Sequence, residues 1–288
     1  MKTIAIYHNK GGVGKTTTAV NLAAAFSNKN KKVLLIDIDA QANSTFATGL
    51  IKFQFDEQDN LKDNNVLKLL YGKNQKRVLV SDVARPSEGF NTPEIDVVPS
   101  HIKLIDMQTE LAQSATIRYR LDTKLQEVED DYDFVIIDAP PSRDVYAQVA
   151  LVAADYLIIP SDMKPFSNQG LTNVIDFIQE ANEIRDVKGK FPLEVIGVLP
   201  SKVSTNSKYQ EFVFPKQRET VAKDYGLPVT DTVIHERAAL SNCVNNTLTV
   251  GDLEVPDPKS IFEFSPKADS VTEFRNLSSE VMRKMGVS

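Results

Sequence analysis

A short run near the start of the chain combines residue types that suit phosphate binding. Positions 10–17 read K-G-G-V-G-K-T-T, so two lysines enclose three glycines and two threonines follow. Glycines let the backbone approach a ligand closely, and the N–H groups of a turn that opens a helix converge on an anion. In such a loop Lys15 would contact the β- and γ-phosphates of a nucleotide, and the Thr16 hydroxyl would bind Mg²⁺. The predicted nucleotide contacts are Lys10, Gly11, Gly12, Val13, Gly14, Lys15, Thr16 and Thr17.

The loop departs from the usual nucleotide-binding pattern in two ways. The pattern G-x-x-x-x-G-K-[ST] requires a glycine where this chain has Asn9, and Lys10 adds a second positive charge. A glycine-rich surface turn with two exposed lysines is the alternative. However, an apolar strand is predicted over 3–7, and apolar residues recur with helical spacing over 16–26. The order of strand, loop and helix therefore favours a site for a nucleoside triphosphate.

Two other apolar runs end in aspartates. Asp37 and Asp39 come at the end of the run over 32–39, and Asp138 ends the run over 132–138. Because ligands of open α/β sheets bind at the carboxyl ends of the strands, these side chains should lie near the phosphates. Aspartates that only cap a strand end are the alternative. The predicted metal ligands are Thr16, Asp39 and Asp138, with Asp37 as an accessory group.

These charges suit hydrolysis of a nucleotide rather than its storage. Phosphoryl transfer to water requires neutralisation of the γ-phosphate and a group that orients the attacking water. Lys15 and Mg²⁺ would supply the charge, and Asp39 is the candidate for orienting the water. Lys10 comes before the loop closes and is poorly placed for its own γ-phosphate; if it acted across a dimer interface, it would resemble a basic finger supplied by a second subunit. The predicted catalytic residues are Lys10, Lys15 and Asp39.

Apolar runs alternate with helical patterns along the rest of the chain. This alternation predicts an α/β fold, a mostly parallel sheet with helices on both faces and right-handed crossovers. No internal repeat or long linker divides the sequence, so a single domain over 1–288 is predicted. Strands are predicted over 3–7, 32–39, 78–83, 95–98, 132–138, 156–160, 193–199 and 229–234, helices over 16–26, 66–71, 102–111, 171–183 and 271–285, and loops over 53–65, 85–93, 161–169 and 247–258.

Composition limits the class of protein. The chain has 288 residues, 42% hydrophobic and 25% charged, the balance of an ordinary globular protein with room for a full core. Its single cysteine, Cys243, excludes an intramolecular disulfide and is expected to be a buried small residue. No apolar run reaches the roughly 18 residues that span a bilayer. The net charge of -6 means that contact with nucleic acid requires a local basic patch.

Three motifs together resemble the ParA/Soj partition ATPases. These proteins have a deviant Walker A sequence and belong to a larger group with MinD and the nitrogenase iron protein. The motifs are K-G-G-V-G-K-T-T at 10–17, D-x-D-x-Q-x-N at 37–43 and Y-D-F-V-I-I-D-A-P-P at 132–141. The similarity runs over most of the chain and is poor at about 51–95 and 245–260.

The resemblance implies a P-loop NTPase type of fold and an ATPase that uses ATP and Mg²⁺. It implies an ATP-sandwich homodimer in which Lys10 reaches the nucleotide of the other subunit, with Asp39 required for hydrolysis and Asp138 near the metal. Family members bind non-specific DNA as ATP-bound dimers, and a ParB-like partner stimulates hydrolysis and release. The expected location is the cytoplasm, on the nucleoid, with a plasmid, a chromosome or a protein assembly as cargo.

DNA binding requires a basic surface, and the candidates lie between 201 and 240. The predicted DNA contacts are Lys202, Lys208, Lys216, Arg218 and Arg237. Acidic residues in the same stretch nearly balance them, so an ordinary solvated surface is the alternative. The sequence predicts moderate DNA binding that weakens with salt.

Two other functions fit the same motifs. A MinD-like regulator would cycle on membranes through the amphipathic helix over 271–285, but the mixed charges of this helix favour packing against the core. A metabolic ATP-dependent enzyme of the same fold would need a second pocket, and the sequence contains no catalytic set beyond the phosphate site. Only Met1 and Lys2 precede the first strand, so an N-terminal helix-turn-helix is not expected.

Overall fold

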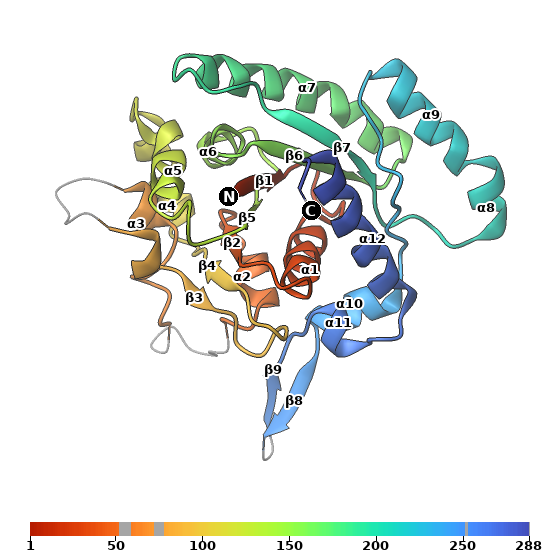
Figure 1. The fold of residues 1–288 in the computed structure, drawn as a ribbon, viewed down its shortest axis with the longest axis horizontal. Helices are drawn as coiled ribbons and strands as arrows, with labels where there is room; N and C mark the ends of the chain where they lie inside the picture. The colour runs from red at the N-terminus through yellow and green to blue at the C-terminus, as the bar shows by residue number, and fades with distance from the viewer. Residues whose placement is uncertain (52–58, 72–77, 251–252, 288) are drawn as a thin grey trace.

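Seven strands form one sheet, whose order is β3-β4-β2-β5-β1-β6-β7. The computed structural model describes residues 1–51, 59–71, 78–250 and 253–287 (Figure 1). Neighbouring strands are parallel except β3 and β4. This order confirms the predicted mostly parallel sheet. The strands are β1 (Lys2–Ile6), β2 (Val33–Asp37), β3 (Arg85–Pro86), β4 (Asp96–Val98), β5 (Phe134–Asp138), β6 (Tyr156–Ser161) and β7 (Glu194–Pro200).

Helices cover both faces of the sheet (Figure 1). One hydrophobic core contains side chains of α3 to α7 and α9, and a second contains side chains of α1, α2 and α10 to α12. The helices are α1 (Lys15–Ser27), α2 (Asn43–Ala47), α3 (Leu67–Leu70), α4 (Leu104–Ala112), α5 (Ile117–Gln126), α6 (Val145–Ala153), α7 (Pro165–Asp186), α8 (Ser207–Phe212), α9 (Phe214–Asp224), α10 (Ala238–Val244), α11 (Ile261–Phe264) and α12 (Asp269–Lys284).

The central strands are apolar along their whole length because both of their faces are covered. Strands β2 and β5 read V-L-L-I-D and F-V-I-I-D, and every residue of both is buried. Such continuous apolar runs are typical of parallel strands between two layers of helices. Their register pairs Asp37 directly with Asp138, so the two aspartate-ended strands finish side by side.

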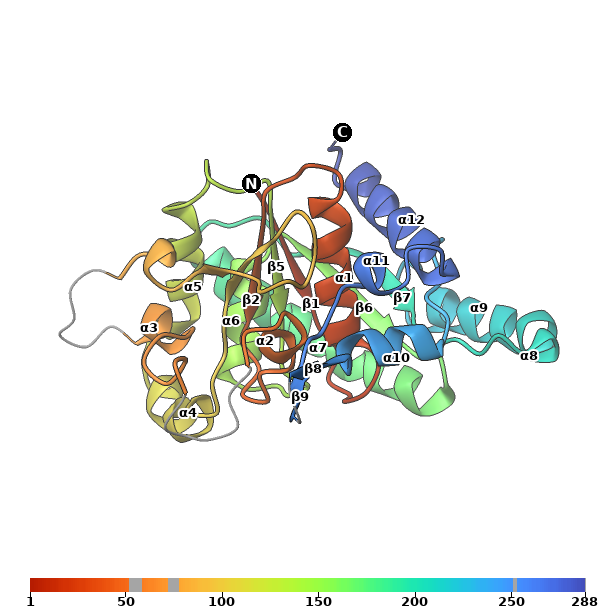
Figure 2. The same cartoon turned by 90° about the horizontal axis from the view of Figure 1, so that it is seen from below.

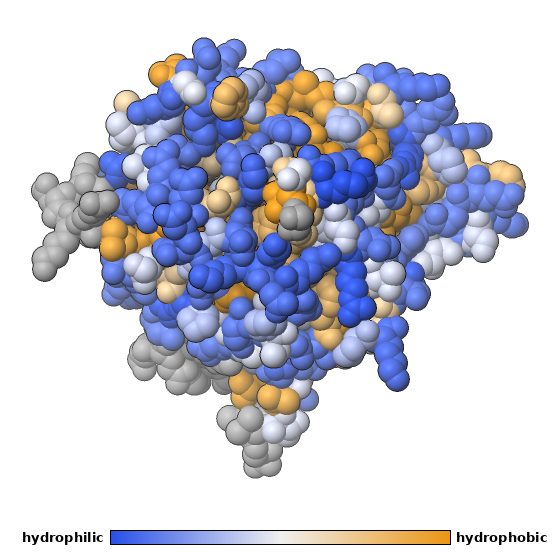
Figure 3. Space-filling model, viewed as in Figure 1, coloured by the Kyte–Doolittle hydropathy of each residue, from blue (hydrophilic) through white to orange (hydrophobic). Residues whose placement is uncertain are grey.

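The last helix packs against the core, as its pattern predicts. Val271, Phe274, Leu277 and Val281 of α12 are buried in the same cluster as the apolar side of α1. Hydrophilic side chains lie along its outer face (Figure 3). Among the described parts of the chain, no helix has both the length and the apolar character that a membrane crossing requires.

Two predicted strands are wrong. Over 78–83 the chain forms a 3₁₀ helix (Val80–Asp82), because Val80 and Val83 are buried at the spacing of one such turn and the Asp82 carboxylate accepts the N–H of Leu79. The short strand β3 lies instead within the predicted turn 85–93.

The predicted strand 229–234 is reduced to single bridges. Val229 pairs with Val198, and outside the range His235 pairs with Val203. Between these bridges the N–H groups of Asp231 and Thr232 donate to the Glu280 carboxylate of α12, at 2.8 Å each, instead of to a strand.

Of three predicted loops, one is a hairpin, one is shorter than predicted and one lies partly outside the described residues. Over 247–258 the structure has a hairpin, β8 (Thr247–Val250) and β9 (Leu253–Pro256), where the prolines of the range had favoured a loop. The predicted loop 161–169 is shorter, because Pro165 occupies the first turn of α7, a position that suits its fixed φ. In the predicted loop 53–65, residues 53–58 lie outside the described residues, and the chain from Asp59 to Asn65 forms turns.

Candidate functional site

The glycine-rich loop connects β1 to α1 at the carboxyl edge of the sheet. Gly12 and Gly14 have φ angles of 77° and 92°, a left-handed conformation that favours glycine. Gly14 is the residue that caps α1, so the first N–H groups of this helix open toward the loop. The Lys15 ammonium donates to the Lys10 carbonyl at 3.0 Å. Burial lowers the pKa of Lys15, and the charges of Asp138 and Asp39 oppose this shift.

Lys10 is held by the start of α7. Its ammonium donates to Ser167 Oγ at 2.5 Å and lies 3.3 Å from Asp162 Oδ2. Its backbone N–H donates to Nδ1 of the buried His8 at 2.9 Å. Helix α7 comes close to this segment at Gly170, where a Cβ would lie 3.0 Å from Asn9 Oδ1 and 3.2 Å from His8 Cε1. The structure therefore orients Lys10 from both its backbone and its side chain.

Asp138 and Thr16 meet, as the prediction of a metal site requires. Asp138 Oδ2 accepts hydrogen bonds from Thr16 Oγ1 at 2.8 Å and from Ser44 Oγ at 2.7 Å. The other oxygen, Oδ1, is buried and has no hydrogen-bond partner among the described residues. Burial raises the pKa of this carboxyl, and the hydrogen bonds from Ser44 and Thr16 lower it. A hydroxyl beside a carboxylate with an unused oxygen fits Mg²⁺, which takes few protein ligands and completes its shell with phosphate and water.

Asp37 and Asp39 differ in environment. Asp37 is buried, and its Oδ2 accepts both the N–H and the hydroxyl of Thr45 at 2.8 Å. Its Oδ1 accepts the N–H of Asp39 at 3.1 Å. Burial and the neighbouring Asp138 raise the pKa of Asp37. Asp37 therefore organises the turn after β2, whereas Asp39 lines the open cleft, where its Oδ1 accepts the N–H of Gln41 at 3.0 Å.

A cleft of about 520 Å³ opens beside the glycine-rich loop. The loop and α1 supply one wall, α2 a second, and α10 a third; Figure 2 shows α2 and α10 near the beginning of α1. The wall from α10 could not be predicted from the sequence, because no local pattern places this helix beside the loop. The lining residues beyond the predicted loop and Asp39 are Gln41, Asn43, Phe46, Pro141, Lys202, Leu240, Ser241, Val244 and Asn245.

The five predicted DNA contacts lie on different elements and differ in their partners. Lys202 lines the cleft beside the loop, and the exposed Lys208 and Lys216 lie on α8 and α9. Arg218 donates to the Thr230 carbonyl at 2.8 Å. Arg237 pairs with Asp269 at 2.9 Å and with Glu273 at 3.1 Å, both on α12.

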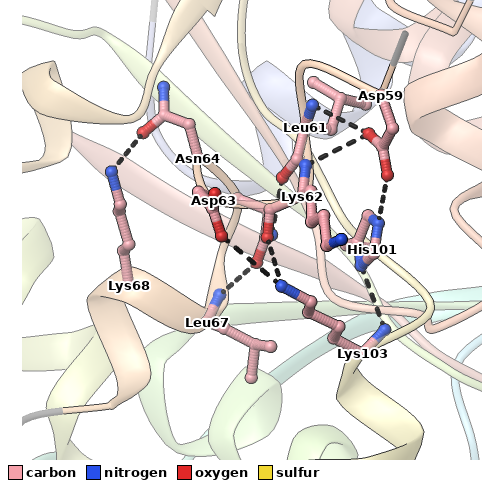
Figure 4. Close-up of polar contacts among 10 residues, drawn as sticks. Asp59, Leu61, Lys62, Asp63, Asn64, Leu67, Lys68, His101 and Lys103 are labelled. Atoms are coloured by element: carbon pink, nitrogen blue, oxygen red, sulfur yellow. Dashed lines mark hydrogen bonds and ion pairs between the residues drawn. The ribbon is translucent and has the colours of Figure 1, made fainter. Parts of the chain in front are cut away.

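The side chains of His101 and His235 contact acidic side chains of the fold. His101 Nε2 lies 2.7 Å from Asp59 Oδ2, and its Nδ1 accepts the N–H of Lys103 (Figure 4). His235 Nδ1 lies 2.8 Å from Glu273 Oε1. Within the described residues, no group of three or more His, Cys, Asp and Glu side chains could hold a metal ion. A magnesium ion held by Thr16 and Asp138 would therefore take its remaining oxygen ligands from the nucleotide and water.

The parallel sheet, the glycine-rich loop ahead of α1 and the neighbouring aspartate-ended strands define a P-loop NTPase-like protein. The sequence model of a family described as an AAA domain matches residues 1–190. The chromosome partitioning protein ParA of Caulobacter vibrioides is 31% identical over 243 residues, which cover 84% of this chain and 83% of that protein. The sporulation initiation inhibitor protein Soj of Bacillus subtilis is 29% identical over 282 residues, 97% and 98% of the two chains. The chain therefore belongs to the AAA domain family and, within it, to the ParA/Soj group.

Solved structures share the fold. Cobyrinic acid a,c-diamide synthase of Mycobacterium smegmatis, with bound ADP and magnesium, has a TM-score of 0.77 at 23% identity and covers 99% of this chain and 96% of its own. Apo McdA of Cyanothece has a TM-score of 0.75 at 24% identity, with 98% and 99% covered. A putative plasmid partition protein of Borrelia burgdorferi bound to AMPPNP has a TM-score of 0.69 at 24% identity, with the same coverage of 98% and 99%.

Proposed function

We propose that the protein is a partition ATPase that binds ATP and Mg²⁺, dimerises with ATP and hydrolyses it. The observation that carries this proposal is the cleft lined by the glycine-rich loop and Asp39, with Asp138 hydrogen-bonded to Thr16 beside it. Membership of the ParA/Soj group and the nucleotides bound by proteins of the same fold support the choice of ATP.

The site residues divide into three tasks. The N–H groups of the loop and the ammonium of Lys15 bind the phosphates. Thr16 and Asp138 hold the magnesium, with Asp39 near enough to the cleft to contribute. When bound, the metal neutralises charge on the phosphates. The Asp39 carboxylate lines the cleft and accepts a hydrogen bond from the attacking water, which it thereby orients.

The proposed dimer gives Lys10 a role in the reaction. Its own ammonium is engaged by Asp162 and Ser167, whereas the ammonium of Lys15 belongs to the phosphate loop itself. A positive charge supplied by a second subunit stabilises the charge that develops during phosphoryl transfer and raises the rate by powers of ten. Lys10 would supply this charge to the nucleotide of the partner.

The dimer is proposed to bind non-specific DNA in the cytoplasm, on the nucleoid, and to be released when a ParB-like partner stimulates hydrolysis. The ion pairs of Arg237 with Asp269 and Glu273 reduce what this side chain can offer a phosphate. Lys202, Lys208 and Lys216 are then the principal candidates. Two subunits side by side would double this charge, so binding should depend on ATP and fall steeply with salt.

One experiment tests the proposal, retention of random-sequence DNA together with sizing of the protein, with and without ATP. The native protein should retain DNA and elute as a dimer only with ATP. Asp39→Ala should remain an ATP-bound dimer with little hydrolysis, and Lys10→Ala should fail to form a productive dimer. Lys29→Ala is the matched control, because Lys29 follows the end of α1 that is opposite to the loop, and its ammonium bonds to Ser279 on α12. The control should behave as the native protein does.

Each part of the proposal has its own contrary result. Equal retention of DNA with and without ATP would refute the nucleotide-dependent DNA binding. Normal hydrolysis by Asp39→Ala would refute the water-orienting role. Turnover that a small metabolite stimulates, without DNA or protein partner, would favour the metabolic enzyme. Flotation of the ATP-bound protein with anionic liposomes would favour the MinD-like regulator, although α12 already has its apolar side chains in the core.

A further inference from the structure

Ser100 joins the end of β4 to the turn that carries Asp39. Its side chain has no exposed surface, and its Oγ donates to the Asp39 carbonyl at 2.6 Å. Its backbone N–H donates to Thr45 Oγ1 of α2 at 2.8 Å. One residue therefore bonds to both segments that follow β2 on this side of the sheet.

These bonds belong to a closed ring. Thr45 Oγ1 accepts from Ser100 and donates to Asp37 Oδ2 at 2.8 Å, and Asp37 Oδ1 accepts the N–H of Asp39 at 3.1 Å. The Asp39 residue is thus held at its N–H by Asp37 and at its carbonyl by Ser100. Because the backbone is held on both sides, Asp39 presents its carboxylate to the cleft from a fixed position.

The turn after Ser100 is fixed from its outer side as well. His101 Nε2 lies 2.7 Å from Asp59 Oδ2, and Nδ1 accepts the N–H of Lys103 at 3.1 Å, so the proton of this imidazole is on Nε2 (Figure 4). The Lys103 ammonium donates to the Lys62 carbonyl at 3.1 Å. Hydrogen bonds of His101 and Lys103 therefore hold the turn that follows Ser100.

We propose that Ser100 is a positioning residue for hydrolysis, whose hydroxyl holds Asp39 where its carboxylate orients the attacking water. The proposal rests on the proposed function, because it assigns to Ser100 a task in the reaction of the same cleft. A group that acts on water must be placed to within a fraction of an ångström, and loss of such placement costs rate rather than nucleotide affinity. Ser100 contacts neither the glycine-rich loop nor the Thr16–Asp138 pair in any hydrogen bond of the described residues.

The test compares Ser100→Ala with Ser27→Ala. Ser27 is a matched control, because it is 2% exposed and donates to a carbonyl, that of Pro93, at 2.8 Å. Both variants should lose a similar few degrees of thermal midpoint. Ser100→Ala should bind ATP within twofold of the native affinity and turn it over about tenfold more slowly, whereas Ser27→Ala should turn over normally. Ser100→Thr, which keeps the hydroxyl, should recover part of the rate.

The outcomes separate this inference from the proposed function. If the native protein does not hydrolyse ATP, the proposed function fails. If it does and Ser100→Ala turns over at the native rate, or if Ser27→Ala is slowed equally, the positioning role of Ser100 is refuted. Ser100→Ala should also have no further effect in an Asp39→Ala background, and an additional loss there would contradict action through Asp39. Should Ser100→Ala not fold, Ser100→Cys, of similar size but with a weak donor, makes the same comparison.

Discussion

Lys10 Nζ lies 3.3 Å from Asp162 Oδ2, an ion pair that ties the glycine-rich loop to the residue after β6. Ser167 Oγ accepts from the same ammonium at 2.5 Å and donates to Asp162 Oδ1. The side chains of Asp162 and Ser167 thus hold the lysine that is proposed to reach the nucleotide of a second subunit. Because an ammonium cannot make both sets of contacts, Asp162 competes with the partner for Lys10.

Asp162→Asn should therefore favour the nucleotide-dependent dimer. Removing the carboxylate charge weakens the contact within one chain and leaves a side chain of the same size. A partly buried pair of this kind contributes about 1 kcal/mol, or about a fivefold change in an equilibrium constant. Each of the two subunits gives up one such pair on dimerisation, so the dimerisation constant with ATP, measured by sedimentation, should tighten by about 25-fold. Asp63→Asn, which removes the surface pair with Lys103, should leave it unchanged. A weaker dimer for Asp162→Asn would show that the carboxylate assists rather than restrains Lys10.

Thr16 and Ser44 provide a matched pair for the metal site. Both hydroxyls donate to Asp138 Oδ2, at 2.8 and 2.7 Å, but only Thr16 is on the phosphate loop. Thr16→Ala should lower the affinity for ATP in Mg²⁺ by about 100-fold and have little effect in EDTA, because it removes a metal ligand. Ser44→Ala removes only a hydrogen bond to Asp138, so it should lower the affinity for ATP in Mg²⁺ by at most about tenfold. Titration of a fluorescent ATP analogue measures both. Equal losses in Mg²⁺ and EDTA would contradict a metal-binding role for Thr16.

The central sheet and the loop could be predicted because their signals are local. A strand of continuous apolar residues that ends in aspartate carries its own evidence of burial and of position, and parallel register then brings Asp37 and Asp138 together. The same reasoning placed Thr16 next to Asp138, which the structure confirms.

Features that depend on distant segments could not be predicted in this way. The N–H groups of Asp231 and Thr232, which a strand over 229–234 would pair with its neighbour, donate instead to Glu280 of α12, a helix near the end of the chain. Leu240 and Ser241 line the cleft only because α10 returns to the loop. The pairing of Arg237 with Asp269 and Glu273 likewise depends on where α12 docks, so a count of charges along the sequence could not predict it.

Arg185 is another residue whose role depends on distant contacts. Its side chain is 2% exposed and donates to the carbonyls of Val152 at 2.9 Å, Leu151 at 3.2 Å and Phe191 at 2.7 Å. Arg185→Met should lower the free energy of unfolding by about 3 kcal/mol, because it leaves several buried carbonyls without donors.

Urea unfolding at neutral pH measures the free energy of unfolding of the native protein, of Arg185→Met and of a control variant. Arg275→Met is the control, because Arg275 is exposed on α12 and lies over the Phe262 ring at 5.9 Å. Arg275→Met should lower the free energy of unfolding by less than about 1 kcal/mol. If Arg185→Met were as stable as this control, water or a rearranged loop would have to replace the lost donors.

His8 should make the stability of the fold fall in acid. Burial, with the charges of Lys15 and Lys10, lowers the pKa of His8 from 6.5 to about 4. Between these values the unfolded chain binds a proton that the folded protein does not, so the free energy of unfolding decreases as the pH falls through this window. The contribution of His8 is complete above pH 6.5 and amounts to about 3 kcal/mol, which is lost by about pH 4. His8→Gln cannot take up this proton.

The difference between the two proteins is the quantity to measure. Urea unfolding at pH 7, 5.5 and 4 should show the native protein losing about 3 kcal/mol more than His8→Gln over this range, because all carboxylates titrate alike in both. The sign is fixed by the direction of the shift, since a raised pKa would have produced a gain in acid instead. Parallel pH profiles for the two proteins would mean that the His8 imidazole is protonated in the folded state, beside Lys10 and Lys15.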